Sequence, residues 1–185
     1  MSNVKKLFYI GASAKTIKSD KSESVYKTAI MYLAPANNVA NINVCSMAVV
    51  ANCLKACLYT SGLASVYATV NAARVRKTEL LRDDKKAFMA ILVKDAKREL
   101  KRAAKNGYKL AVRLNGTQDW NWENEPVTVD GIDYPNIFAA FFPIITFYDY
   151  TKNISAKRIA AIKAIPNYSV TACLLYTSPS PRDRS

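Results

Sequence analysis

The chain has 185 residues, with 27 Lys and Arg against 14 Asp and Glu, and 50% of its residues are apolar. This length and composition are typical of one globular domain that can bury a core, and they do not indicate disorder. Within these 185 residues, the absence of histidine excludes Ser-His-Asp and Cys-His nucleophile pairs, His-ligated zinc and an imidazole proton shuttle.

Strand-like and helical patterns alternate along the first half of the chain, which favours an α/β fold with a mostly parallel sheet. The expected elements in chain order are strands at residues 6–10 and 27–33, helical spacing over 46–58, a helix over about 64–81, and a second helix that begins at Asp83 or Asp84 and ends at Asn106-Gly107. An apolar stripe marks one face of the second helix, and basic residues occupy the rest.

The second half continues the same alternation. The expected elements are a strand at 109–114, a polar segment at 118–126, a turn at Asp130-Gly131, a short helix at 136–142, a strand at 144–148, a helix at 154–165 and a strand that begins at 168–171. Together these patterns predict one α/β domain over residues 1–172, built as an incomplete, mostly parallel βα-repeat sheet or a partial TIM-like barrel.

Residues 173–185 resemble the conceptual translation of a transposase sequencing adapter. We therefore expect this tail to be non-native and the natural chain to be truncated near Ala172. The basic character of the chain does not depend on the tail.

Two strands are expected to end in polar residues, at 113–117 and 148–152. Ligands bind at the carboxyl ends of parallel strands in open sheets and barrels of this class, so we expect a pocket there. The residues expected to bind a polar substrate are Arg113, Asn115, Thr117, Asp119, Glu123, Asp149, Tyr150 and Lys152. Turn formation and capping are the alternative roles for these side chains. Trp120 and Trp122 would stack on a base or cover a core.

Cys45, Cys53 and Cys57 form a C-x7-C-x3-C pattern. Three thiolates suit zinc or an iron–sulfur cluster and leave one position open, for water on zinc or for a substrate or S-adenosylmethionine on a four-iron cluster. The alternative is three core cysteines, since Cys53 and Cys57 would share a helix face and cysteine packs like a small hydrophobe.

Several segments resemble the bacteriophage gene product 88-like family. They are Asn43-Val-Cys45, Asn52-Cys-Leu-Lys-Ala-Cys57, Ala111-Val-Arg-Leu-Asn-Gly-Thr117 and Phe147-Tyr-Asp-Tyr-Thr-Lys152. The resemblance implies a phage or prophage protein. Its cysteine-rich front, followed by strand-helix units, is similar to radical S-adenosylmethionine enzymes, and so implies an iron–sulfur cluster on a partial barrel. The usual C-x3-C-x2-C loop and a recognisable Gly-rich segment are absent, and Gln118 stands where family members often have Ser.

The excess of Lys and Arg favours a nucleotide or nucleic-acid partner, although a solvated basic face is the more ordinary interpretation. No apolar stretch is long enough to cross a bilayer, and we expect a protein of the host cytoplasm. The leading hypothesis is an iron–sulfur protein that acts on a nucleotide or nucleic acid. The alternative is a non-enzymatic nucleic-acid-associated protein with structural cysteines or zinc.

Overall fold

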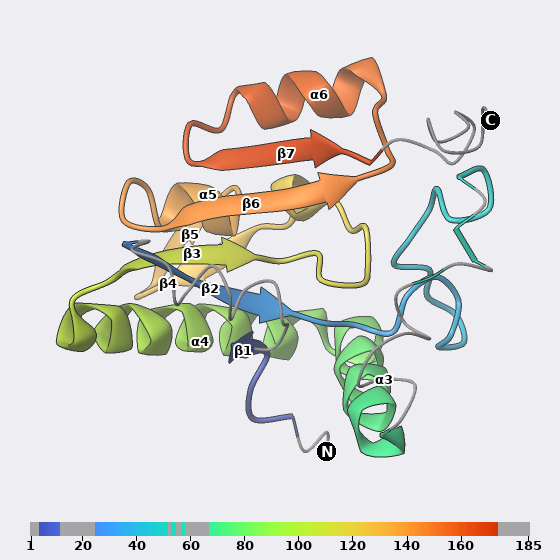
Figure 1. Cartoon of the computed structure of the whole chain (residues 1–185), viewed down its shortest axis with the longest axis horizontal. Coiled ribbons are helices and arrows are strands. Elements are labelled where there is room, and N and C mark those ends of the chain that lie inside the picture. The colour runs from blue at the N-terminus through green and yellow to red at the C-terminus, as the bar shows by residue number, and fades with distance from the viewer. Residues whose placement is uncertain (1–3, 12–24, 52, 55–56, 58–66, 174–185) are drawn as a thin grey trace, which may run out of the picture.

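The structure is a computed structural model, and it describes residues 4–11, 25–51, 53–54, 57 and 67–173 (Figure 1). Its centre is a five-stranded sheet in the order β1-β2-β3-β6-β7. The strands are β1 (Phe8–Ile10), β2 (Tyr26–Met31), β3 (Lys109–Arg113), β6 (Thr146–Thr151) and β7 (Tyr168–Ala172). The strand β1 pairs antiparallel with β2, and all other neighbours are parallel, which confirms the predicted α/β class with a mostly parallel sheet.

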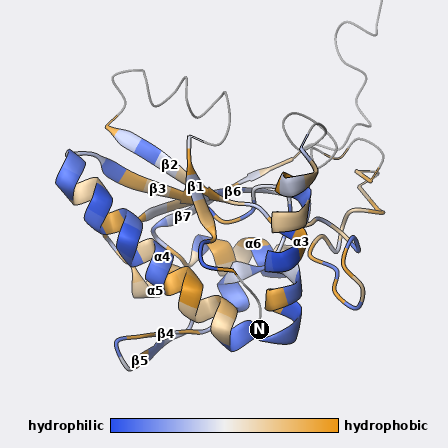
Figure 2. Cartoon of the chain, turned by 90° about the horizontal axis from the view of Figure 1, so that it is seen from below, coloured by the Kyte–Doolittle hydropathy of each residue, from blue (hydrophilic) through white to orange (hydrophobic). Residues whose placement is uncertain are grey.

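Helices and a small hairpin connect the strands of this sheet. They are α3 (Ala68–Asp83), α4 (Lys85–Asn106), α5 (Ile137–Ala140) and α6 (Ala156–Lys163), with a short 3-10 turn η2 (Trp122–Asn124) and a hairpin of β4 (Val127–Val129) and β5 (Ile132–Tyr134). The parallel strands are adjacent in chain order, so right-handed crossovers place their connections on the same side of the sheet. Figure 2 shows α4, α5, α6 and the hairpin gathered on that side.

The sheet of the described residues is open, with β1 and β7 at its edges. A strand order that follows the chain, with connections on one side, is also the order within a βα barrel. Closure into a barrel is not seen in this part of the chain. None of the helices described here is long and apolar enough to span a membrane.

Both ends of α4 agree with the prediction. The Asp84 carboxylate accepts a hydrogen bond from the backbone N–H of Ala87 at 2.9 Å, which caps the first turn, and Gly107 ends the helix with φ at 70°. The apolar side of the helix also carries Asp95, which is fully buried and accepts hydrogen bonds from the backbone N–H groups of Leu7 and Phe8 at 2.6 and 3.1 Å. Asp95 therefore joins α4 to the beginning of β1.

The core lies between the sheet and these helices. Phe138 of α5 stacks on Tyr168 of β7 with ring centroids 4.0 Å apart and meets Phe147 of β6 edge-on at 4.9 Å. All three rings are buried, so they anchor α5 against the second half of the sheet.

Two local predictions differ from the structure. Residues 46–51 form hydrogen-bonded turns instead of the predicted helix, with Ala48 N–H bonded to Cys45 O at 2.9 Å and Ala51 N–H to Met47 O at 2.8 Å. The predicted turn at Asp130-Gly131 is present, with φ of 52° and 81°, but it joins two strands that were not predicted. Three-residue strands are too short to show a reliable alternation. The predicted adapter tail beyond Cys173 lies outside the described residues.

Candidate functional site

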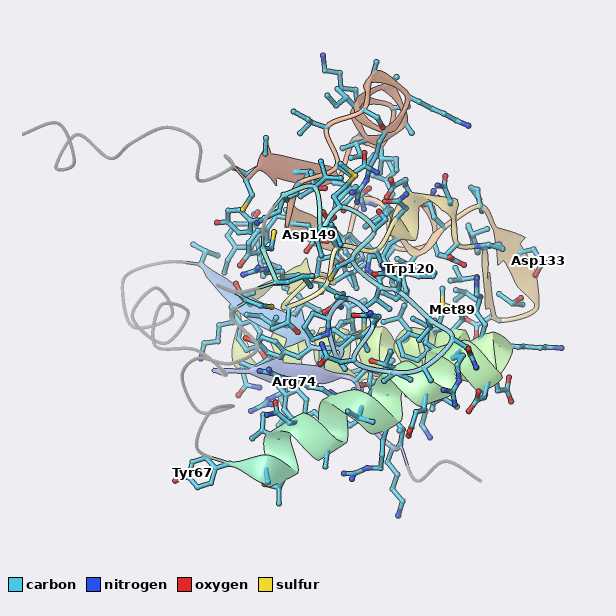
Figure 3. The ribbon with its side chains drawn as sticks, turned by 90° about the vertical axis from the view of Figure 1, so that its right-hand side faces the viewer. Tyr67, Arg74, Met89, Trp120, Asp133 and Asp149 are labelled. Carbon is cyan, nitrogen blue, oxygen red and sulfur yellow. The ribbon has the colours of Figure 1, made fainter. Side chains whose placement is uncertain are left out.

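A cavity of about 300 Å³ lies at the carboxyl ends of β2, β3 and β6. This is the edge where the sequence predicts a pocket. We call it the carboxyl-edge cavity, and its lining comprises Pro35, Ala36, Asn38, Cys45, Met47, Ala48, Cys53, Leu54, Cys57, Arg113, Asn115, Gly116, Thr117, Gln118, Asp119, Tyr150, Thr151, Lys152 and Cys173. Figure 3 views the molecule from the side toward which the parallel strands point, with Asp149 and Trp120 labelled near the middle.

All three predicted cysteines line this cavity. Cys45 is buried and forms a parallel bridge with Asp119, whose N–H donates to Val44 O at 2.9 Å. The Cys45 thiol lies 3.9 Å from the Thr117 carbonyl oxygen. Burial raises the pKa of Cys45 to about 11, and the nearby Asp119 carboxylate acts in the same direction. Cys45 is therefore a protonated thiol at neutral pH in the absence of a metal.

Cys53 and Cys57 are both half-buried. The Cys53 N–H donates to Ala48 O at 3.0 Å, which holds this residue to the turns after Cys45. Within the described part of the chain, no three Cys, Asp or Glu side chains are grouped closely enough to hold a metal ion. The thiols thus share one cavity without being arranged as a ligand set.

Six of the eight residues predicted to bind substrate line the cavity, namely Arg113, Asn115, Thr117, Asp119, Tyr150 and Lys152. The Arg113 guanidinium lies over the Tyr150 ring at 4.8 Å and donates to Asn115 O at 3.0 Å. Arg113 and Lys152 both line the cavity. Two cations in the lining favour an anionic ligand in this cavity.

Gly116 allows the two central strands to approach closely at this wall. A Cβ at Gly116 would lie 2.6 Å from the Tyr32 ring and would also collide with Met31 O. The Gly116 N–H donates to that same carbonyl at 3.0 Å. Any side chain here would push the ends of β2 and β3 apart.

Glu123 and Asp149 do not line the cavity and lie behind its wall. Asp149 is 1% exposed and accepts hydrogen bonds from Asn115 N–H at 2.7 Å and from the Tyr168 hydroxyl at 3.2 Å. Burial raises the pKa of Asp149 to about 7, although these two donors oppose the shift. Burial and the neighbouring Asp149 raise the pKa of Tyr168.

Asp149 therefore makes stability depend on pH. Its folded-state pKa of about 7 exceeds the ordinary value of 3.8, so the native state binds the proton more tightly than the unfolded state does. The free energy of unfolding, relative to an Asp149→Asn variant, should fall as pH rises from about 4 to about 7 and then level off. Urea titrations of both proteins across this window measure the difference. A constant difference would show that the Asp149 carboxyl ionises normally.

Arg158 of α6 is a residue that sequence reasoning missed. Its guanidinium is buried and bonds to Asp119 at 2.9 Å, to Glu123 at 2.8 Å and to the Thr151 hydroxyl at 2.6 Å. Asp119 also accepts from the Lys152 N–H at 2.8 Å. This ion-pair network holds the loop after β3 against the end of β6, so it positions Asp119 in the cavity.

Gln118, which stands where related sequences often have Ser, was not predicted to form the site. Its buried amide oxygen accepts from Leu33 N–H at 3.0 Å and from Thr117 N–H at 3.2 Å, and its amide nitrogen donates to Leu114 O. Gln118 therefore ties the end of β2 to the end of β3. Asn38, Met47 and Cys173 are among the other lining residues that were not predicted to form the site.

The described residues thus form an α/β protein with an open, mostly parallel sheet and, at its carboxyl edge, a cavity lined by three thiols and by Arg113 and Lys152. The chain belongs to the gene product 88 family, a phage-type family whose model matches residues 5–178. No curated protein and no solved structure matches the chain.

Proposed function

We propose that this phage-type protein binds a nucleotide or nucleic-acid substrate in the carboxyl-edge cavity, beside an iron–sulfur cluster held by Cys45, Cys53 and Cys57. The observation that carries the proposal is that three thiols separated in sequence line one cavity together with two cations, Arg113 and Lys152. Thiolates are the preferred ligands of such clusters, and cations are the preferred partners of phosphate groups.

The cluster requires these residues to approach one another. Its three thiols already share a cavity of about 300 Å³, but in the described structure they do not form a group close enough to hold a metal ion. The proposal therefore includes movement of the segment that carries Cys53 and Cys57 toward Cys45 when iron binds. A four-iron cluster with one open iron would supply an electron and a coordination position for S-adenosylmethionine.

The protein's own residues would position the substrate. Arg113 and Lys152 would bind its anionic groups, and the Thr117 hydroxyl is held by a 2.6 Å hydrogen bond to Leu33 O. Asp119 is fixed by Arg158 and Thr151 and presents the carboxylate of the cavity. The strand order of a partial barrel is consistent with this placement, because barrel enzymes bind substrates at the same edge.

A second function is favoured by the surroundings of Cys45. Its buried thiol, with a raised pKa and a carbonyl partner, has the environment of a structural cysteine. In this proposal the chain is a non-enzymatic nucleic-acid-associated protein, and its cysteines pack in the cavity wall or hold a structural zinc.

Metal analysis separates these functions. After anaerobic purification of the full chain, the cluster proposal expects about four iron and four sulfide per chain and a brown protein. Replacing Cys45, Cys53 and Cys57 together with Ser should remove both, whereas the neighbouring change Ser46→Ala should not. One zinc per chain would favour the structural alternative. A colourless, metal-free and folded protein would end the cluster proposal.

A further inference from the structure

The face of the sheet opposite α4 and α5 carries five tyrosines, which we call the tyrosine face: Tyr9, Tyr26, Tyr32, Tyr148 and Tyr150. The strand register places them together. Tyr9 of β1 pairs with Ile30 of β2, and Ile30 pairs with Arg113 of β3. Side chains alternate along a strand, so Tyr26 and Tyr32 point to the same side as Ile30.

The other two tyrosines come from β6. Ala111, two residues before Arg113, pairs with Thr146, and alternation then places Tyr148 and Tyr150 on that same face. Their rings meet edge-on with centroids 6.4 Å apart. Tyr9, Tyr26 and Tyr150 remain 38%, 40% and 41% exposed, so part of each side chain faces solvent.

Cations accompany these rings. Lys6 lies over Tyr9 at 5.3 Å, Lys109 over Tyr26 at 5.9 Å, and Arg113 over Tyr150 at 4.8 Å. Asp149 is the acidic residue in the described strands of this sheet. Its side chain points to the buried face, away from the tyrosines. The tyrosine face therefore combines exposed rings with positive charge and has no acidic strand residue in this part of the chain.

We propose that the tyrosine face binds single-stranded nucleic acid, with bases stacked on the rings and phosphates paired with the flanking Lys and Arg. Stacking on aromatic side chains within a basic surface is the general means of binding single strands without sequence preference. A duplex hides the faces of its bases and cannot use the rings. The chemistry of this face thus distinguishes single strands from duplexes.

The tyrosine face is continuous with the carboxyl-edge cavity. Tyr150 belongs to both, and Arg113, which lies over its ring, also lines the cavity. A strand stacked across β2, β3 and β6 would therefore lead one nucleotide into the cavity. In this respect the inference rests on the proposed function and names its substrate class. Binding of a strand to the face does not itself require the cluster.

Fluorescence anisotropy with a labelled oligothymidylate tests the inference on the full chain. Tyr26→Leu and Tyr9→Leu should each weaken binding about 10-fold, because each change removes a ring on which a base stacks. Tyr26→Phe keeps the ring and should bind nearly as the wild type does. The matched control is Tyr134→Leu, on the hairpin at the opposite side of the sheet. Lys109→Gln should reduce the salt dependence of log K by about 0.7.

Wild-type affinity in both leucine variants would overturn the inference, as would equal affinity for a duplex of the same length. Loss of binding in a Lys94→Gln, Lys101→Gln double variant alone would assign the polyanion to α4 instead. Iron content and oligothymidylate binding, both measured on the wild type and on the tyrosine variants, separate the two proposals. A metal-free wild type that still binds oligothymidylate through Tyr26 removes only the cluster, whereas an iron-loaded protein insensitive to the tyrosine changes removes only the tyrosine face.

Discussion

Replacing Arg158 with methionine is expected to lower the free energy of unfolding by about 3–5 kcal/mol. The arginine side chain is 3% exposed, and its partners Glu123 and Asp119 are 2% and 13% exposed. Methionine fills much of the same volume but leaves both carboxylates without their cation. The cost is therefore that of unpaired buried charge and not that of a cavity.

Urea unfolding monitored by circular dichroism measures this loss, with Lys157→Met as the control. Lys157 is the preceding residue of α6 and is exposed, so its replacement should cost well under about 1 kcal/mol. A similarly small loss for Arg158→Met would mean that the ion pairs contribute no more than surface pairs do. The network would then not be what holds Asp119 in the cavity.

The sequence contained enough local information for several elements. Residues 85–106 show a complete helical pattern, with a carboxylate before its first residue and a glycine after its last. The observed helix α4 spans the same residues, Lys85–Asn106. The predicted strand over 109–114 is β3, whose polar continuation lines the cavity. Periodicity, caps and the rule for the carboxyl ends of strands are all local or topological, so they are readable without a structure.

The segment after Cys45 was predicted less well because its conformation depends on distant residues. The apolar spacing indicates a helix, but Cys45 bridges to Asp119, far along the chain, and the residues that follow form turns. Spacing within a helix therefore does not describe how Cys45, Cys53 and Cys57 approach one another. Their shared cavity comes from tertiary structure.

Buried ion pairs are also hidden in the sequence. Arg158 belongs to a helix with basic neighbours, where it looks like part of a solvated surface, yet it is 4% exposed. Its partners are 35 and 39 positions away. The tyrosine face is hidden in the same way, because its tyrosines are distributed over several strands and only the register brings them together.

The second large effect is expected at Trp122, which packs behind the cavity wall. Its side chain is fully buried and stacks on Phe88 of α4 with centroids 6.0 Å apart. Its indole N–H donates to the Asn115 side-chain oxygen at 2.9 Å, and Asn115 lines the cavity. Trp122→Ala should therefore lower the free energy of unfolding by about 3–5 kcal/mol, through lost packing and a new void.

Trp122→Phe separates packing from hydrogen bonding in the same unfolding experiment. Phenylalanine keeps a ring against Phe88 and loses the indole N–H, while the Asn115 oxygen retains the N–H of Trp120 at 3.1 Å. The hydrogen bond itself contributes about 1 kcal/mol, so this variant should lie much closer to the wild type than Trp122→Ala does. Equal losses in the two variants would show that the hydrogen bond to Asn115, and not the stacked rings, holds the wall of the cavity in place.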